Sequence, residues 1–132
     1  MNNIFIGKQA SISKAFTDND VKAFSDLSLD NNPIHLDEAY AKGSIFKQRI
    51  VHGFLYGSLI SAVIATKLPG PGSIYLYQEM NFKNPVFRDE IVTAVVTVID
   101  INEKKSIVTL DTRCLKGKDE IVIEGKAILK MF

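Results

Sequence analysis

Two histidines occur in the chain, and one of them, His35, closes the stretch LDNNPIH, which also holds the carboxylate of Asp30. Asn32 and Pro33 lie between the two. Asparagine and aspartate favour turns because their side chains bond nearby backbone groups, and proline stiffens the loop. A rigid turn predicts that Asp30 and His35 face the same space, where a carboxylate and an imidazole can hold one water molecule and move its protons. The alternative is a helix-ending turn with a solvent-exposed histidine.

The second histidine, His52, lies directly before Gly53 in the stretch IVHGF. A long apolar segment begins at Gly53, and the first N–H groups of a helix have no internal partner and carry partial positive charge. Glycine lets a ligand oxygen approach closely, so the Gly53 N–H is a candidate donor to a developing oxyanion. The alternative is that Gly53 only permits tight entry into the helix. His52 is interpreted as structural or as a neighbour of the site, and the spacing of Asp30, His35 and His52 matches no zinc pattern, so no metal is predicted.

Composition excludes several other functions. Sixteen basic and fifteen acidic residues give a net charge of +1, and the sequence has no basic run, so a nucleic-acid partner is not expected. No apolar run is long enough to span a membrane, and the N-terminus lacks a signal pattern. The single cysteine, Cys114, forms no internal disulfide, is interpreted as a buried strand thiol, and fits a cytoplasmic protein. Phosphate-loop and G-x-S-x-G motifs are absent.

The first part of the chain is predicted to be helical. In TDNDVKAFSDLS, Thr17 is a candidate N-cap, with acidic residues in the first turn. Val21, Phe24 and Leu27 recur at three-residue spacing and predict one apolar face. The helix should end before DNNP because a proline disfavours helical geometry at the preceding residue. LDEAYAKG predicts a short helix that ends at Gly43.

The residues that follow predict one helix against one sheet. The segment from Gly53 to Lys67 is apolar nearly all round, which predicts a buried helix. After Ser73, four segments rich in β-branched and aromatic residues predict an antiparallel meander, and another strand is expected near NIFIGKQASISKAF. The expected fold is α+β, in one domain over residues 1–132. A single helix cannot cover such a sheet, so a homodimer, or a multiple of dimers, is expected.

The motifs D-x-N-P-x-H and IVHG, taken together, resemble the hydratase-2 motif of MaoC-like proteins, which include the (R)-specific enoyl-CoA hydratases. The resemblance covers the chain from about Ile6 to Phe132. It implies a hot-dog fold, in which a curled antiparallel sheet of about five strands wraps one long central helix. It also implies that two subunits pair, with their active sites near the interface.

The resemblance also assigns roles to individual residues. Asp30 and His35 match the catalytic pair, and Gly53 matches the residue whose N–H holds the thioester carbonyl. Ser61 matches a serine that the family has near the active site, although a small residue for close helix packing is the alternative. Asn32 matches the motif asparagine and is interpreted as a turn organiser, together with the neighbouring proline.

One position departs from the family pattern. The family usually has glycine before the aspartate, and this chain has Leu29. Leucine strongly disfavours a positive φ. The loop is therefore expected to adopt a negative φ at Leu29, or to carry strain there.

The reaction implied by the resemblance is reversible syn addition of water to trans-2-enoyl-CoA, giving (R)-3-hydroxyacyl-CoA, with no cofactor. Three alternatives remain open: dehydration of a 3-hydroxyacyl group on acyl-carrier protein, thioester hydrolysis by a hot-dog thioesterase, and non-catalytic binding of acyl thioesters. The near-neutral net charge gives no guide to the carrier.

Overall fold

The structure, a computed structural model, describes residues 3–132 and has an α+β architecture, as predicted. The helices are α1 (Asp18–Ser28), α2 (Pro33–Leu36), α3 (Glu38–Lys42) and α4 (Gly53–Thr66). The strands are β1 (Gln9–Ala15), β2 (Ser73–Gln78), β3 (Asn81–Phe82), β4 (Ile91–Asn102), β5 (Ile107–Lys116) and β6 (Glu120–Met131).

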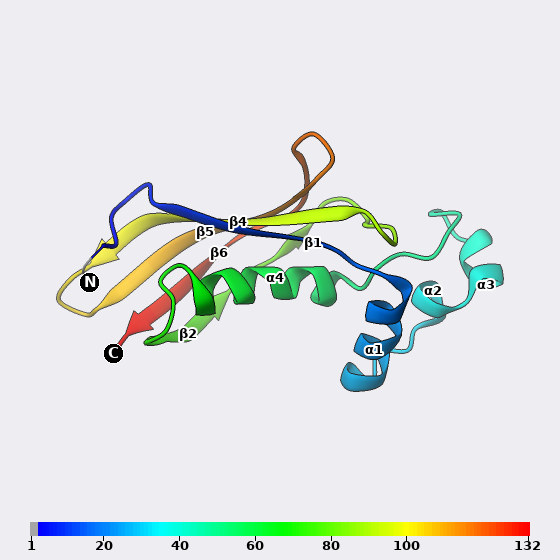
Figure 1. The fold of residues 1–132 in the computed structure, drawn as a ribbon, viewed down its shortest axis with the longest axis horizontal. Coiled ribbons are helices and arrows are strands. Elements are labelled where there is room, and N and C mark those ends of the chain that lie inside the picture. Colours follow the sequence, from blue (N-terminus) through cyan, green and yellow to red (C-terminus); the bar gives the residue numbers. More distant parts are fainter. Residues whose placement is uncertain (1–2) are drawn as a thin grey trace.

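The strands form one antiparallel sheet in the order β1-β4-β5-β6-β2, with the short β3 also paired to β6. The prediction of a simple four-strand meander is therefore wrong at its first strand, which breaks into β2 and β3 and pairs with β6. The chain passes along one face of the sheet in α4 before β2 begins, so β2 reaches the edge opposite β1 (Figure 1).

The core lies between α4 and the sheet. Alternate residues of β4 point inward and are fully buried, as Val92, Ala94 and Val96 illustrate. Val63 and Ile64 of α4 are buried against them, and this burial of apolar surface is the main stabilising contribution. Cys114 lies fully buried on β5, as predicted.

Helix α4 leaves one stripe uncovered, although its sequence is apolar nearly all round. Phe54, Ser58, Ser61 and Ala65 are exposed, and their spacing puts them on one side of the helix. The prediction of a buried helix is thus confirmed for the side that faces the sheet. In the part of the chain described here, no helix combines the length and apolar character needed to cross a membrane.

Helix α1 begins at the predicted N-cap, because Thr17 Oγ1 accepts from the Asp20 N–H at 3.2 Å and the Asp20 carboxylate accepts from the Thr17 N–H at 2.9 Å. Its predicted apolar face is wrong at Leu27, which is 85% exposed. A helix turns about 100° per residue, so Leu27 lies roughly 120° from Val21, whereas Ser25 lies only about 40° away. Ser25 accordingly takes the buried position.

Leu29 ends α1 in the left-handed region, with φ 68° and ψ 8°. The expectation of a negative φ is wrong, and the strained alternative holds. Such a conformation costs a non-glycine residue on the order of 1 to 2 kcal/mol. Leu29 thereby turns the chain sharply from α1 into the Asp30 loop. As Figure 1 shows, α1, α2 and α3 gather beyond the end of the sheet that is opposite the C-terminus.

Candidate active site

The DNNP turn leads directly into α2, which carries His35. Asn32 is the N-cap of α2: its side-chain oxygen accepts from the Ile34 N–H at 3.1 Å, and Pro33 occupies the first helical turn. Proline is well suited to this position because its missing N–H would have no helical partner. Both residues therefore organise the turn, as the sequence predicted.

The His35 ring is fixed by one backbone contact. His35 Nδ1 lies 2.9 Å from the Ile50 carbonyl oxygen, and a carbonyl can only accept, so Nδ1 carries the proton. In the neutral ring Nε2 is then left with a free lone pair. Ile50 is in turn tied to Phe87 through a β-bridge. His35 is only 9% exposed, so its ring is both held and largely shielded.

Asp30 and His35 are close enough to share one water molecule. A carboxylate oxygen of Asp30, a ring nitrogen of His35 and a ring nitrogen of His52 all lie within 4.8 Å of one another. Two hydrogen bonds of about 2.8 Å that meet at one water oxygen span roughly 4.5 Å. The predicted pairing of Asp30 and His35 is therefore geometrically possible within a single subunit. The alternative of an exposed histidine is excluded by the burial of His35.

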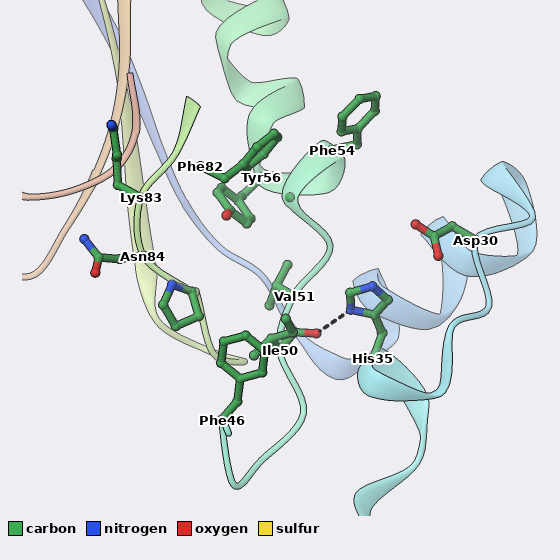
Figure 2. A pocket seen from close by; sticks show the side chains of 12 residues that line it. Asp30, His35, Phe46, Ile50, Val51, Phe54, Tyr56, Phe82, Lys83 and Asn84 are labelled. Carbon is green, nitrogen blue, oxygen red and sulfur yellow. Dashed lines mark hydrogen bonds between the residues drawn. The ribbon is translucent and has the colours of Figure 1, made fainter. Parts of the chain in front are cut away.

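The pair opens onto a pocket of about 460 Å³. Figure 2 shows Asp30 and His35 on one wall and Phe82, Lys83 and Asn84 on the opposite wall, with the start of α4 between them. The lining is mainly apolar, and its residues are Asp30, His35, Phe46, Ile50, Val51, Gly53, Phe54, Tyr56, Phe82, Lys83, Asn84 and Pro85. An apolar pocket with a few convergent polar groups is typical of small-molecule sites.

Gly53 is the first residue of α4 and lines this pocket. Its N–H is one of those that an α-helix leaves without an internal partner. A Cβ atom at this position would lie 2.5 Å from Cε1 of Phe82. Gly53 therefore has a packing role that sequence reasoning did not identify, because only glycine allows the Phe82 ring to close over the start of the helix. This packing role is compatible with the role of the Gly53 N–H as an oxyanion donor.

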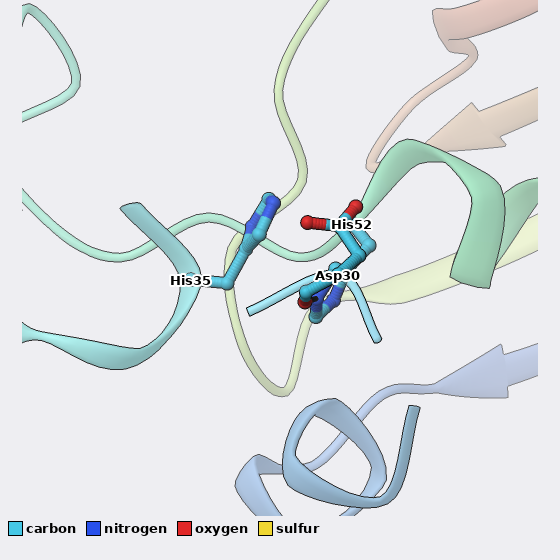
Figure 3. Close-up of side chains that lie close together, drawn as sticks. All are labelled: Asp30, His35 and His52. Carbon is cyan, nitrogen blue, oxygen red and sulfur yellow. Dashed lines mark hydrogen bonds between the residues drawn. The ribbon is translucent and has the colours of Figure 1, made fainter. Parts of the chain in front are cut away.

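His52 contacts both other residues of the cluster, Asp30 and His35, which Figure 3 draws together with it. His52 Nε2 is 3.0 Å from the Asp30 carbonyl oxygen and 3.0 Å from Ser25 Oγ, and its ring stacks on His35 with centroids 3.8 Å apart and planes 26° apart. Burial lowers the pKa of His52, and the bond to Asp30 opposes this only in part. The interpretation of His52 as a neighbour of the site fits these contacts.

The cluster of Asp30, His35 and His52 has the residue types of a metal site but not the ring geometry. The lone pairs of imidazole nitrogens lie in the ring plane. In rings stacked nearly face to face, at 26°, these lone pairs run side by side and do not converge on one ion. His52 Nε2 is also engaged with Asp30 and Ser25. The arrangement suits proton chemistry better than tetrahedral metal binding.

Arg49 braces the elements around the site and was not identified from the sequence. Its buried guanidinium donates to Asp18 of α1 and to Glu38 of α3, both at 2.9 Å, and to the carbonyl of His35 at 3.5 Å. Arg88 also contacts Glu38 at 3.3 Å. An arginine can satisfy several acceptors in one plane, so Arg49 ties α1, α2 and α3 together beside the sheet.

Ser61 is not brought to the Asp30–His35 pair. It lies eight residues after Gly53 on α4, which is about 12 Å along the helix axis. Ser61 lines a smaller, mainly apolar pocket of about 260 Å³ that shares Phe54 with the larger one. Within one subunit, Ser61 is therefore too distant to hold the same oxygen atom as Gly53.

Tyr56 is a pocket residue that the sequence interpretation missed. It follows Gly53 by one helical turn, and this spacing could have identified it. Burial raises the pKa of Tyr56 to about 12, so the phenol remains protonated near neutral pH. Phe82, Lys83 and Asn84 are brought to the pocket only by tertiary folding, and no spacing in the sequence indicates this.

Comparison with known proteins agrees with this geometry. The family model described as "MaoC like domain" matches residues 7–117. An (R)-specific enoyl-CoA hydratase of Rhodospirillum rubrum is 47% identical and covers 92% of this chain and 83% of its own. One of Aeromonas caviae is 44% identical, with 96% and 94% covered.

Solved structures give the same result. The (R)-hydratase from A. caviae involved in PHA biosynthesis superposes with a TM-score of 0.95 and 42% identity over 100% of both chains. The hot-dog fold implied by the sequence is thus confirmed, with five strands on the main path of the sheet and the short β3 beside them. From the family match and these identities, we conclude that the chain belongs to the MaoC-like family.

Proposed function

We propose that the protein is an (R)-specific enoyl-CoA hydratase, a hydro-lyase that adds water reversibly to trans-2-enoyl-CoA and gives (R)-3-hydroxyacyl-CoA. The observation that carries this proposal is the shared pocket of Asp30, His35 and the Gly53 end of α4. The relatives named for this activity, at 44% and 47% identity, support the substrate and the stereochemistry.

The water molecule is held between two acceptors. The ionised carboxylate of Asp30 accepts one of its hydrogens and the free Nε2 of neutral His35 accepts the other, because His35 Nδ1 is engaged with Ile50. This leaves a lone pair of the water oxygen free to attack C3 of the enoyl group. We assign the role of base to Asp30 and the orientation of the water to His35.

The thioester oxygen receives the displaced electrons. As the C3–O bond forms, negative charge develops on this oxygen, and the Gly53 N–H at the positive end of α4 stabilises it. The pair then delivers the proton taken from water to C2 on the same side, and the addition is syn. One O–H bond of water and the C2–C3 π bond are broken, and one C–O bond and one C–H bond are formed. The reaction requires no cofactor or metal.

A second copy of the chain is part of this proposal. The start of α4 and the β2–β3 edge carry an apolar face, defined by Phe54, Tyr75 and Phe82, whose side chains are 39% to 67% exposed. Phe54 stacks on Phe82 and lines a pocket with Tyr75. A contiguous exposed apolar surface of this kind is typical of an interface. Two single hot-dog domains, each spanning residues 1–132, would pair through it. Ser61 adjoins this face and would contact the acyl chain, not the thioester oxygen.

A cytoplasmic location is the remaining element of the proposal. The unpaired, buried thiol of Cys114 supports it, because such thiols persist in reducing compartments. The CoA substrate would connect the enzyme to fatty-acid metabolism.

The experiment is hydration of crotonyl-CoA by the purified protein, in the presence of a chelator. The expected result is loss of the enoyl absorbance, no release of free thiol, and a 3-hydroxybutyryl product of the (R) configuration. Thiol release would favour thioester hydrolysis. No reaction with enoyl groups on CoA or on acyl-carrier protein would favour non-catalytic binding. Activity only with enoyl groups on acyl-carrier protein would favour the dehydratase alternative.

A further inference from the structure

His52 is a buried polar side chain that the proposed mechanism does not use. It is 1% exposed and is the N-cap of α4, one residue before Gly53. Its side chain makes no hydrogen bond to cap the helix. Within residues 3–132, its Nδ1 is buried without any hydrogen-bond partner. A buried polar atom without a partner is costly, so an apolar side chain would serve packing better.

The first contact of His52 holds the backbone of Asp30. The Asp30 carbonyl, 3.0 Å from His52 Nε2, can only accept, so Nε2 carries the proton of the ring. Ser25 Oγ, also 3.0 Å from Nε2, shares this N–H. Asp30 follows the strained Leu29 and is itself exposed. The other hydrogen bonds of Asp30 are local, from its N–H to Ser28 Oγ and from the Asn32 N–H to its carboxylate. The bond from His52 therefore adds an anchor between this loop and the start of α4.

The second contact holds the plane of the His35 ring. His52 stacks on His35 at 3.8 Å, while the edge of Phe24 packs against His52 at 4.8 Å. The bond from His35 to Ile50 fixes the in-plane direction of the ring, and the His52 face fixes its tilt. Together they decide where His35 Nε2 points (Figure 3).

We propose that His52 is a positioning residue for the hydration, one that sets the water site by holding the Asp30 backbone with its N–H and the His35 ring with its face. The inference rests on the proposed function. The titratable groups that face His52 are Asp30 and His35, and its other contacts, Ser25 and Phe24, are uncharged. The neutral Nε2–H tautomer provides both contacts at once.

The test compares His52→Gln with His52→Met in hydration of crotonyl-CoA. Glutamine presents an N–H at nearly the same reach as Nε2 and keeps the bond to Asp30, whereas methionine fills the space without a donor. The expected kcat of His52→Met is roughly tenfold below that of His52→Gln, about the value of one hydrogen bond. KM should stay within about threefold, because His52 does not line the pocket.

Stability separates positioning from packing. Methionine removes a buried nitrogen without a partner but also the donor to the Asp30 carbonyl. These two changes offset each other, so His52→Met should unfold at about the same temperature as His52→Gln. If His52 had only a structural role, the variant with the lower kcat would also have the lower unfolding temperature. A His52→Met variant as active as His52→Gln would overturn the inference. An inactive wild type would instead refute the proposed function.

A measurement on the unmodified protein does not depend on the folding of either variant. Nitrogen NMR of the imidazole rings should show His52 as the neutral tautomer with the proton on Nε2 near neutral pH. A charged His52, or a proton on Nδ1, would be incompatible with the proposed positioning role.

Discussion

Replacement of Gly53 separates the contribution of its N–H from that of its missing side chain. Gly53→Pro removes the N–H and adds a Cβ, whereas Gly53→Ala adds the Cβ and retains the N–H. The added Cβ lies 2.5 Å from the Phe82 ring in both variants. The Phe82 ring must therefore shift in each case, by the same cause. The alanine variant is thus the matched control for the displaced pocket wall.

The backbone at this position accepts proline. Proline is favoured at the first position of a helix, and it restricts the preceding residue to extended or polyproline geometry. His52 already has φ −58° and ψ 132°, which lies in that region. Gly53→Pro should therefore fold, and circular dichroism will check this.

The loss of kcat expected for Gly53→Pro is that of removing one hydrogen-bond donor to the oxyanion. Such a donor typically contributes about 10² to 10³ in kcat, so Gly53→Pro should fall below Gly53→Ala by this factor in crotonyl-CoA hydration. Displacement of Phe82 should act mainly on KM and should be common to both variants. If Gly53→Ala loses as much kcat as Gly53→Pro, the pocket wall and not the N–H accounts for the loss, and Gly53 has no oxyanion role.

Three further predictions concern stability and assembly. Leu29→Gly should raise the unfolding temperature by a few degrees, because relief of left-handed strain exceeds the extra chain entropy of glycine; Leu27→Gly, equally exposed but within α1, should lower it. The free energy of unfolding should fall as the pH is lowered from about 7 to about 5. Burial lowers the pKa of His52 from its usual 6.5, so in this range the unfolded chain binds a proton that the folded chain does not. Urea titrations should show a smaller fall in His52→Gln. Sedimentation equilibrium at micromolar concentration should give at least twice the mass of one chain. Tyr75→Lys should lower the measured mass, whereas Ile91→Lys on β4 should leave it unchanged. A monomeric wild type with full activity would exclude the dimer.

Local patterns in the sequence predicted the parts of the fold that depend on local chemistry. The Thr17 cap, the buried side of α4 and the Asn32–Pro33 turn depend on residues close together in the chain, and all three are confirmed. The pairing of β2 with β6 was missed because strand order depends on long-range contacts. The face of α1 was misjudged because three-residue spacing drifts around a helix, which exposes Leu27.

The sequence predicted only those residues of the candidate site that lie within its two motifs. Asp30, His35 and Gly53 meet at one pocket, as expected. The Arg49 brace and the Phe82 wall were not foreseen, because each depends on residues distant in sequence. Leu29 shows where a rule for single residues fails. Leucine disfavours a positive φ, yet Leu29 adopts one, and the bond from His52 to Asp30 holds the loop that follows it.

The most direct test of the central claim, that Asp30 and His35 act on one water molecule, is kcat for enoyl-CoA hydration by three folded variants. Asp30→Asn removes the base, and His35→Ala removes the second acceptor of the water. General acid–base groups typically contribute about 10² to 10⁴ each. Because either loss forfeits most of the gain, the double variant should lie within roughly tenfold of the worse single variant. Fully multiplicative losses would mean independent roles, and a folded Asp30→Asn variant with normal kcat would contradict the account.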